Sequence, residues 1–360
     1  MTKEQFISET LSCLQKQLER YPGSRAEDIV KCVFQGLLGI GHLLASPKQV
    51  EAYIVREAAS LSSAPEEPLL EPVSPAWARL NLRRVMAEGL TPHLIAKLMM
   101  SHFEAPDFSR EDVRQVCAEY GQRTGLSGIT DALARIGDEH WLPSHSETYR
   151  QLYRPAYRLI PAQCAPLLPI LCAFAKHDRA NARMFVTIDG LCASGKTTLA
   201  SQLANILDTT VIHTDDFVIP HAKKTPERLA QPGGNCDWER LVGEVIAPWK
   251  SRQTGTYRRY DCHLDCLTPP EPLPAGNILI LEGSYCNLPA IRAYADVRVF
   301  VNTPEFIRWE RLKARESPAS LEMFEERWIP LENAYFEAYG LPDKEIVLVE
   351  TMSSACRITA

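Results

Sequence analysis

The chain of 360 residues is predicted to fold as an all-α N-terminal domain followed by an α/β domain, whose parallel sheet has helices on both faces. Two patterns predict this division. Apolar residues such as Phe6, Leu11 and Leu18 recur at helical spacing, and no β-alternation is clear before residue 183. From residue 183, short apolar runs alternate with helical segments. We expect an α-helical domain over 1–155, a helical linker over 156–182 and the α/β domain over 183–360.

Capping residues mark three helix starts in the first domain. Ser46-Pro47 and Thr91-Pro92 each place a hydroxyl side chain before a proline, which suits the first helical position. Ser144 and Glu147 have the spacing of a capping box. The proline- and glutamate-rich stretch over 62–75 is expected to be a connecting loop.

Five apolar runs are the expected strands of the α/β domain. Each is continuous rather than alternating, which is typical of parallel strands buried on both faces. They cover residues 184–188, 209–214, 277–283, 297–303 and 345–350.

The stretch GLCASGKTT, residues 190–198, lies between the first strand and a helical segment. Its spacing is G-x-x-x-x-G-K-[ST], the phosphate-binding P-loop. The glycines let backbone N–H groups point at phosphates, Lys196 would reach the β- and γ-phosphates, and the Thr197 hydroxyl would hold Mg²⁺. An ordinary glycine turn is the alternative, and it is disfavoured because an apolar strand precedes the loop and a helix follows it, as in a P-loop. The predicted nucleotide-binding residues are Gly190, Ala193, Ser194, Gly195, Lys196, Thr197 and Thr198.

Missing motifs narrow the class of P-loop protein. The chain has neither the N-K-x-D motif that reads guanine nor the L-S-G-G-Q motif of transporter ATPases. The strand over 277–283 ends in Glu282 rather than in an Asp-Glu pair. These features favour a small-molecule kinase that uses ATP and Mg²⁺, although preference for ATP over GTP stays open.

Acidic and basic residues follow two other strands. Asp215 and Asp216 end the strand after the P-loop helix, where ligands bind in parallel sheets, so they are candidates for proton acceptance and Mg²⁺ binding. A solvated turn is the alternative. Arg308, Arg311 and Arg315 share one helix face and could form a lid over the γ-phosphate or a solvated surface.

The order of GLCASGKTT, TDDF, LILEGSY and the arginine helix resembles the kinase group that contains uridine kinase, pantothenate kinase and phosphoribulokinase. The resemblance covers about residues 183–350, and further stretches look like bacterial uridine-kinase-like proteins of undefined substrate. It implies that Asp215 is the catalytic carboxylate, that Glu282 lies near Mg²⁺ and substrate, and that Arg308 and Arg311 are lid arginines. We also expect Lys196 to be catalytic, because it would contact the phosphate that is transferred, and we expect Asp216 to be a further metal ligand.

Two departures put uridine itself in doubt. Uridine kinases typically read D-S-F-Y, whereas this chain has Asp215-Asp216-Phe217-Val218. They also carry a histidine five residues beyond the tyrosine of a Tyr-Asp pair, and here Tyr260 is followed at that place by Asp265. Tyr260 is kept as a substrate-site candidate. A sugar, a polyol or another hydroxyl compound is an equally good acceptor.

Several other polar residues have two interpretations. A polar pocket in the first domain could be formed by His42, His145, Glu147, Tyr149 and Arg150. The favoured alternative is that His42 is a packed histidine and that the other four are caps and surface residues. Cys262, His263, Asp265 and Cys266 have no second ligand pair, so loop cysteines are favoured over a metal site. This domain vaguely resembles an extension seen on uridine-kinase-like proteins, which implies no activity.

Composition excludes some classes of protein. The net charge is −6 and no basic block occurs, which argues against nucleic-acid binding. No long apolar run or signal segment occurs, and the 11 cysteines have no repeated spacing, so we expect a cytoplasmic protein without disulfides. The expected partner is a small-molecule hydroxyl acceptor, with self-association left open. The rival hypotheses are an ATPase switch whose helical domain holds a partner, and a nucleotide-binding module without catalysis.

Overall fold

The computed structural model describes residues 1–39, 46–61, 66–101, 107–136, 143–177 and 183–351. The chain divides into two compact units between Ala165 and Pro166. This boundary lies inside the segment expected as a linker, and that segment is not a single helix. It begins with strand β3 (Tyr157–Pro161), continues as a 3₁₀ helix, η1 (Ala162–Leu167), and ends with α9 (Leu168–Ala175), which packs on the sheet of the second unit.

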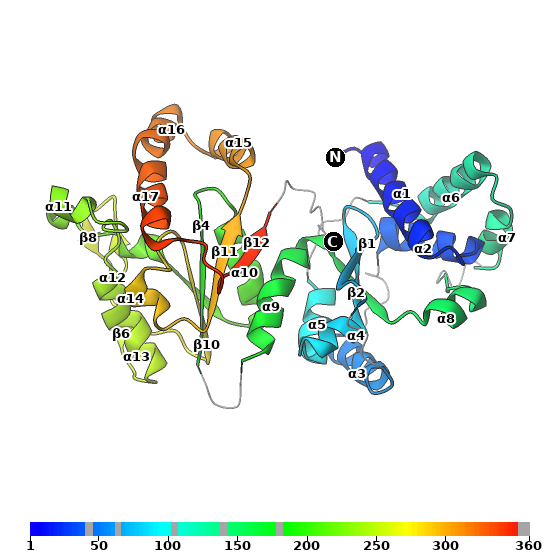
Figure 1. The fold of residues 1–360 in the computed structure, drawn as a ribbon, viewed down its shortest axis with the longest axis horizontal. Coiled ribbons are helices and arrows are strands. Elements are labelled where there is room, and N and C mark those ends of the chain that lie inside the picture. Colours follow the sequence, from blue (N-terminus) through cyan, green and yellow to red (C-terminus); the bar gives the residue numbers. More distant parts are fainter. Residues whose placement is uncertain (40–45, 62–65, 102–106, 137–142, 178–182, 352–360) are drawn as a thin grey trace. The chain divides into compact units, whose positions relative to one another are not determined.

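The first unit is mainly helical, as expected, but it also contains an antiparallel sheet in the order β1-β2-β3 (Figure 1). The first unit is therefore mainly helical, but it is not all-α as expected. Strand β2 is buried along four of its five residues, so it lacks the polar alternation that marks a half-exposed strand. Strand β1 lies within the stretch expected to be a loop. The elements are α1 (Lys3–Arg20), α2 (Ala26–Leu38), α3 (Pro47–Ala58), β1 (Leu70–Pro72), β2 (Trp77–Asn81), α4 (Leu82–Ala87), α5 (Pro92–Met99), α6 (Arg110–Thr124), α7 (Ile129–Ala134), α8 (Glu147–Tyr153) and β3.

Two of the three predicted helix starts are confirmed. The hydroxyls of Ser46 and Thr91 accept backbone N–H groups in the first turns of α3 and α5, each of which opens on a proline. The Ser144 and Glu147 capping box is wrong, because the N-cap of α8 is Ser146, whose hydroxyl accepts the N–H of Tyr149. The same hydroxyl donates to Asp28 at 2.6 Å, and this distant contact helps fix the helix start.

The core of the first unit lies between α1, α2, α6 and one face of its sheet. Phe6 and Leu14 of α1, Val33 of α2 and Trp77 of β2 belong to one buried apolar cluster. In the register of the sheet, Arg79 lies beside Leu159, so this arginine shares the core-facing side. A cationic side chain is thus buried among helices.

The second unit is a parallel five-stranded sheet, and all five predicted strands are confirmed. The strand order is β12-β11-β4-β10-β5, with the P-loop strand β4 in the centre. Figure 1 shows α9 and α10 on one side of this sheet, α12, α13, α14 and α17 on the other, and α15 and α16 above the strands in this view. The strands are β4 (Met184–Gly190), β5 (Thr210–His213), β10 (Ile278–Glu282), β11 (Val297–Asn302) and β12 (Val347–Glu350).

Helices and short hairpins complete the second unit. Its separate core includes Trp249 and Tyr335, both fully buried. The helical elements are α10 (Lys196–Leu207), η2 (Thr214–Phe217), η3 (His221–Lys223), α11 (Pro226–Leu229), α12 (Trp238–Arg240), η4 (Leu241–Ile246), α13 (Ala247–Lys250), α14 (Pro289–Arg292), α15 (Glu305–Arg315), α16 (Pro318–Met323), η5 (Phe324–Trp328) and α17 (Ile329–Tyr339). The short strands are β6 (Thr256–Tyr257), β7 (Tyr260–Asp261), β8 (Cys266–Leu267) and β9 (Glu271–Pro272).

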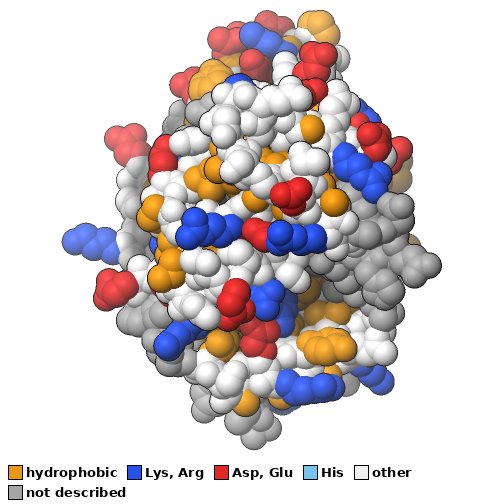
Figure 2. Space-filling model, turned by 90° about the vertical axis from the view of Figure 1, so that its right-hand side faces the viewer, with side chains coloured by type: hydrophobic (Ala, Val, Ile, Leu, Met, Phe, Trp, Pro, Cys, Tyr) orange, Lys and Arg blue, Asp and Glu red, His pale blue; other side chains and the backbone are white. Residues whose placement is uncertain are grey.

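The surface and the cysteines agree with the composition. On the face drawn in Figure 2, basic and acidic side chains are interspersed rather than gathered by sign. All ten cysteines within the described ranges are free thiols. In those same ranges, no helix combines the length and hydrophobicity needed to cross a bilayer.

We expect a chain that begins at Pro166 to fold alone, because the second unit has its own sheet and core. A chain that begins at residue 156 should be less soluble, since it carries β3 without its partner β2. Circular dichroism and size-exclusion chromatography would compare the two. Unfolded or aggregated product from the Pro166 chain would show that its core depends on the first unit.

Candidate active site

The P-loop joins the central strand β4 to helix α10, and its backbone is curled as the sequence requires. Gly190 has a φ of 144°, Ala193 of 56° and Gly195 of 97°. A Cβ atom at Gly190 would lie 2.5 Å from the carbonyl oxygen of Val301, so only glycine fits there. The loop therefore presents its N–H groups and the N-terminus of α10 to one place, which is the geometry of an anion site.

Lys196 closes the P-loop. Its ammonium donates to the carbonyl oxygens of Gly190 at 2.7 Å and Leu191 at 3.0 Å. A pocket of about 400 Å³ opens beside the loop, and Arg311 and Arg315 of α15 also line it. Because Lys196 is a flexible cation that forms no carboxylate ion pair within the described ranges, its charge is available to a phosphate. The other predicted phosphate-binding residues in this lining are Ala193, Ser194, Gly195, Thr197 and Thr198.

Glu282 lies at the end of β10 and faces the start of α10. Its Oε1 accepts the Thr197 hydroxyl at 3.1 Å and contacts Nδ1 of His213 at 2.6 Å. Its Oε2 is buried and has no hydrogen-bond partner among the described residues. A buried carboxylate oxygen without a partner, next to a threonine hydroxyl, fits a Mg²⁺ ion.

His213 is a site residue that the sequence reasoning missed. Its contact with Glu282 raises the pKa of the imidazole above its ordinary value. The only signal in the sequence was its place at the end of an apolar run. The structure adds the parallel register, which places His213 of β5 opposite Glu282 of β10. Protonated His213 would compete with a cation for the same carboxylate.

Asp215 and Asp216 lie on η2, directly after β5. Asp215 is exposed and Asp216 half-buried. Although the side chain of Asp215 reaches solvent, the protein atoms packed around its carboxyl group desolvate it and raise its pKa, and the negative charge of Glu282 raises this pKa further. Desolvation likewise raises the pKa of Asp216. Among the described residues, no three or more His, Cys, Asp or Glu side chains lie close enough together to hold a metal ion by themselves. The role of Asp216 as a metal ligand therefore stays a prediction.

The arginines of α15 divide into two kinds. Arg308 is buried, and its guanidinium contacts the Thr303 carbonyl at 3.3 Å and the Cys192 sulfur at 3.9 Å. Arg311 lies at the pocket, where it donates to the Ala193 carbonyl at 3.0 Å. Arg315 also lines the pocket and is exposed. Arg308 thus supports the loop from beneath, whereas Arg311 and Arg315 face the pocket.

Tyr260 belongs to the β7–β8 hairpin. It is buried, and its hydroxyl donates to Asp265. Asp265 also accepts the N–H of His221 at 3.2 Å, which ties the hairpin to the segment after η2. The aspartate at the unusual position in the sequence therefore holds Tyr260, and Tyr260 as a substrate contact stays a prediction.

Buried carboxylates also tie α17 to the P-loop, and the sequence reasoning missed both. Glu332 accepts the N–H of Cys192 at 2.8 Å and the Ser284 hydroxyl at 2.5 Å. Asp189 accepts the Tyr335 hydroxyl at 2.7 Å. Desolvation raises the pKa of Asp189 to about 6, although the hydrogen bonds that it accepts from Tyr335, Gly190 and Asn287 oppose the shift. The helix that follows the arginine segment is thus bonded to the loop that would hold phosphate.

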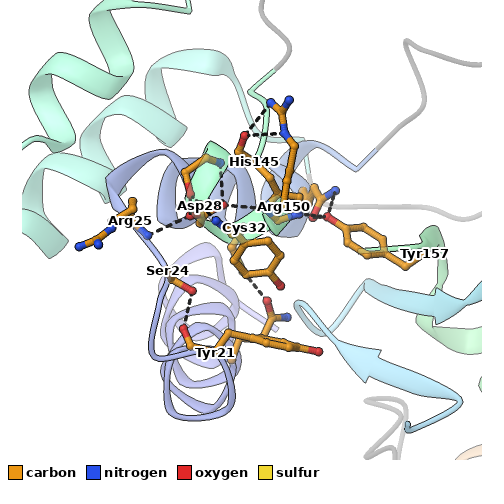
Figure 3. A network of polar contacts seen from close by, with 12 residues as sticks. Tyr21, Ser24, Arg25, Asp28, Cys32, His145, Arg150 and Tyr157 are labelled. Atoms are coloured by element: carbon orange, nitrogen blue, oxygen red, sulfur yellow. Dashed lines mark hydrogen bonds and ion pairs between the residues drawn. The ribbon is translucent and has the colours of Figure 1, made fainter. Parts of the chain in front are cut away.

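A separate buried polar network lies in the first unit (Figure 3). Nδ1 of His145 contacts Asp28 at 2.7 Å, and Nε2 contacts the Tyr157 hydroxyl at 2.6 Å. Tyr149 stacks on the imidazole at 4.1 Å between ring centroids, and Arg150 donates to the His145 carbonyl. Glu147 is exposed and lies 3.9 Å from the Arg150 guanidinium, and His42 lies outside the described residues.

The network predicts a loss of stability in acid. Desolvation lowers the pKa of His145 to about 4, with Lys31 and Arg79 adding to the shift against Asp28. Below about pH 6.5, His145 is protonated in the unfolded chain but stays neutral in the folded one. The free energy of unfolding therefore falls by about 3 kcal/mol between pH 6.5 and pH 4. Urea unfolding against pH would measure this. His145→Gln should flatten the slope, while His93→Gln, at an exposed histidine, should not.

Among known proteins, only solved structures match the chain. No protein-family model and no curated protein matches the chain. A possible uridine kinase from Bacillus stearothermophilus is 22% identical, covers 52% of this chain and 98% of its own, and gives a TM-score of 0.40. A candidate fructose transport system kinase from Silicibacter sp. TM1040 is 22% identical, with coverages of 49% and 93% and a TM-score of 0.39. A sugar kinase from Janibacter sp. HTCC2649 is 16% identical, with coverages of 47% and 84% and a TM-score of 0.27. These three solved structures are each described as a kinase.

Proposed function

We propose that the chain is an ATP-dependent phosphotransferase that moves the γ-phosphate of ATP to a hydroxyl group of a small molecule. One observation carries the proposal. The P-loop, Glu282 and Asp215 follow three adjacent strands of one parallel sheet, and the pKa of Asp215 responds to the charges of both Lys196 and Glu282. The P-loop, a carboxylate that could bind a cation and a candidate base therefore follow the carboxyl ends of neighbouring strands, where parallel sheets bind their ligands.

The proposed step uses these groups in turn. Asp215 takes the proton of the acceptor hydroxyl as its oxygen bonds to the γ-phosphorus, and the bond from that phosphorus to the bridging oxygen of ADP breaks. Lys196 and Arg311 would stabilise the charge on the transferring group. Mg²⁺, held by Thr197 and Glu282, would supply charge neutralisation between the phosphates. Little covalent chemistry is asked of the protein, so catalysis comes from positioning.

A screen for acceptor-stimulated conversion of ATP to ADP tests the proposal. Nucleosides, sugars, polyols and vitamin precursors would be offered with ATP and Mg²⁺, and the phosphorylated product identified by mass spectrometry. We expect at least one class to accelerate ATP consumption and to gain one phosphate. Slow hydrolysis that no acceptor stimulates would instead support an ATPase switch.

Arg311→Ala should lower kcat about a hundredfold with little change in the KM for ATP, because the side chain lies at the pocket and would act on the transferring charge. Arg308→Ala should lower stability as well as kcat, since it removes a buried side chain beneath the loop. Steady-state kinetics and thermal unfolding separate the two. Arg292→Ala on α14 is the control. A rise in the KM for ATP alone would show that Arg311 only binds nucleotide.

A further inference from the structure

The first unit contains a pocket that the phosphotransferase reaction does not use. It has a volume of about 240 Å³ and lies over one face of the sheet β1-β2-β3. Tyr21 from the end of α1 and Tyr149 and Tyr153 from α8 form an aromatic wall, with ring centroids 4.9 to 5.4 Å apart. Tyr157 of β3 completes the lining on the sheet side. A concave space with an aromatic lining is typical of a small-molecule site, and its volume would admit only a small ligand.

Arg79 is the chemically unusual residue of this pocket. It is only 3% exposed, yet its guanidinium meets neutral partners: Nη1 donates to Gln17 at 2.6 Å, and Nε and Nη2 donate to Gln35. It also lies 4.5 Å from the centre of the Tyr157 ring. Each terminal nitrogen carries two N–H groups and has one acceptor among the described residues, so each has an N–H to spare.

The carboxylates of the lining are engaged elsewhere. Glu71 lies opposite Arg79 in the register of the sheet, but it pairs with Arg20 at 3.2 Å and accepts the Tyr21 hydroxyl. Glu67 contacts Arg83 at 3.7 Å. With three arginines and two glutamates in the lining, one positive charge remains, and it is the most deeply buried one. A buried cation without an anionic partner is unfavourable, and an anionic ligand would remove that cost.

Two tyrosines add hydrogen-bond donors. The Tyr153 hydroxyl accepts the N–H of Gly23 at 2.8 Å, and its own proton has no acceptor among the described residues. The Tyr149 hydroxyl likewise has no hydrogen bond within the described ranges. The neutral His145, bonded through Nδ1 to Asp28, accepts the Tyr157 proton (Figure 3). This bond helps hold the Tyr157 ring, whose centre lies 4.5 Å from the Arg79 guanidinium. Tyr149 and Tyr153 thus each have a hydroxyl proton that a ligand could accept.

We propose that this pocket binds a small organic oxyanion, whose charged oxygens accept from Arg79 and from the hydroxyls of Tyr149 and Tyr153. The aromatic wall would contact a planar or apolar body. The single unpaired positive charge fits one carboxylate or phosphate group. This site is independent of phosphoryl transfer in the second unit.

Titration calorimetry on the full chain tests the proposal, with benzoate and inorganic phosphate as probes. A Lys196→Ala background keeps phosphate from binding at the P-loop. We expect at least one probe to bind with a Kd below about 10 mM. Benzoate alone would indicate a carboxylate ligand, and phosphate alone a phosphate ester. No binding of either probe would overturn the proposal.

Variants then place the site. Arg79→Gln should weaken probe binding at least tenfold, while Arg135→Gln, at an exposed arginine of the same unit, should not change it. Because Arg79→Gln disturbs buried contacts, Tyr153→Phe provides a second measurement that removes one hydroxyl, and it should weaken binding about threefold to tenfold. The proposal would be overturned if both single variants, Arg79→Gln and Tyr153→Phe, bound the probe with unchanged affinity. If Arg79→Gln does not fold, unchanged affinity in Tyr153→Phe alone would overturn it.

Discussion

Lys196→Ala should abolish measurable phosphoryl transfer while the chain stays folded. The ammonium of Lys196 lies at the mouth of the P-loop, where it donates to two loop carbonyls and belongs to neither apolar core. Its removal takes a positive charge away from the β- and γ-phosphates, where charge shifts in the transition state. We expect kcat/KM to fall by about three orders of magnitude. A coupled assay of ADP release, run beside circular dichroism, measures both outcomes.

The matched control for this prediction is Lys344→Ala. Lys344 is an exposed lysine of the same unit and lies outside the phosphate pocket. Its replacement removes the same charge from the chain and should leave turnover unchanged. If folded Lys196→Ala turned over ATP at the normal rate, the loop over 190–197 would not be the phosphate grip.

The second unit could be predicted from the sequence because its signals are local. A continuous apolar run, a glycine loop and a helix follow one another between Met184 and Leu207, so neighbouring residues alone specify the strand, the turn and the helix. Glu282 was found in the same way, as the polar residue that ends an apolar strand. The conformation of Gly190 follows from its spacing to Lys196, and the structure confirms it.

The contacts within the site were not predictable, because they join residues far apart in the chain. Glu332 reaches Cys192 across 140 residues, and His213 reaches Glu282 across 69. No periodicity records such pairings. They depend on the strand order, which places β10 between β4 and β5 although it follows both in the chain. The sequence marked the strand ends but not which side chains meet there.

The first unit shows the same limit more strongly. His145 was expected to be a cap or surface residue, and this is wrong, because the structure places it in a buried network with Asp28, 117 residues away. Arg79 carried no signal either, because a single arginine in a short strand resembles an exposed edge residue. Its burial follows from the packing of α1 and α2 on the sheet.

Asp215→Asn should lower acceptor phosphorylation about a hundredfold to ten-thousandfold and leave ATP affinity nearly constant. Asparagine keeps the size of the side chain but removes the oxygen that would take the acceptor proton. The raised pKa of Asp215, caused by desolvation and then by the charge of Glu282, makes the carboxylate a better base than a solvated one. The acid limb of the wild-type rate profile should accordingly lie above the ordinary carboxyl range, because the rate requires Asp215 in its ionised form.

Asp216→Asn is the matched control, since it makes the same change on the next residue of η2. Asp216 is half-buried and is not expected to accept the proton of the acceptor. Its replacement should therefore lower the rate of acceptor phosphorylation less than Asp215→Asn does, once Mg²⁺ is saturating. Nucleotide binding measured by calorimetry and product formation measured by mass spectrometry distinguish the two variants. A large loss in Asp216→Asn with near-normal turnover in Asp215→Asn would show that the two roles are reversed. If neither variant lost activity, the acceptor would bind elsewhere, and hydrolysis coupled to a partner would explain the P-loop better than transfer to a hydroxyl.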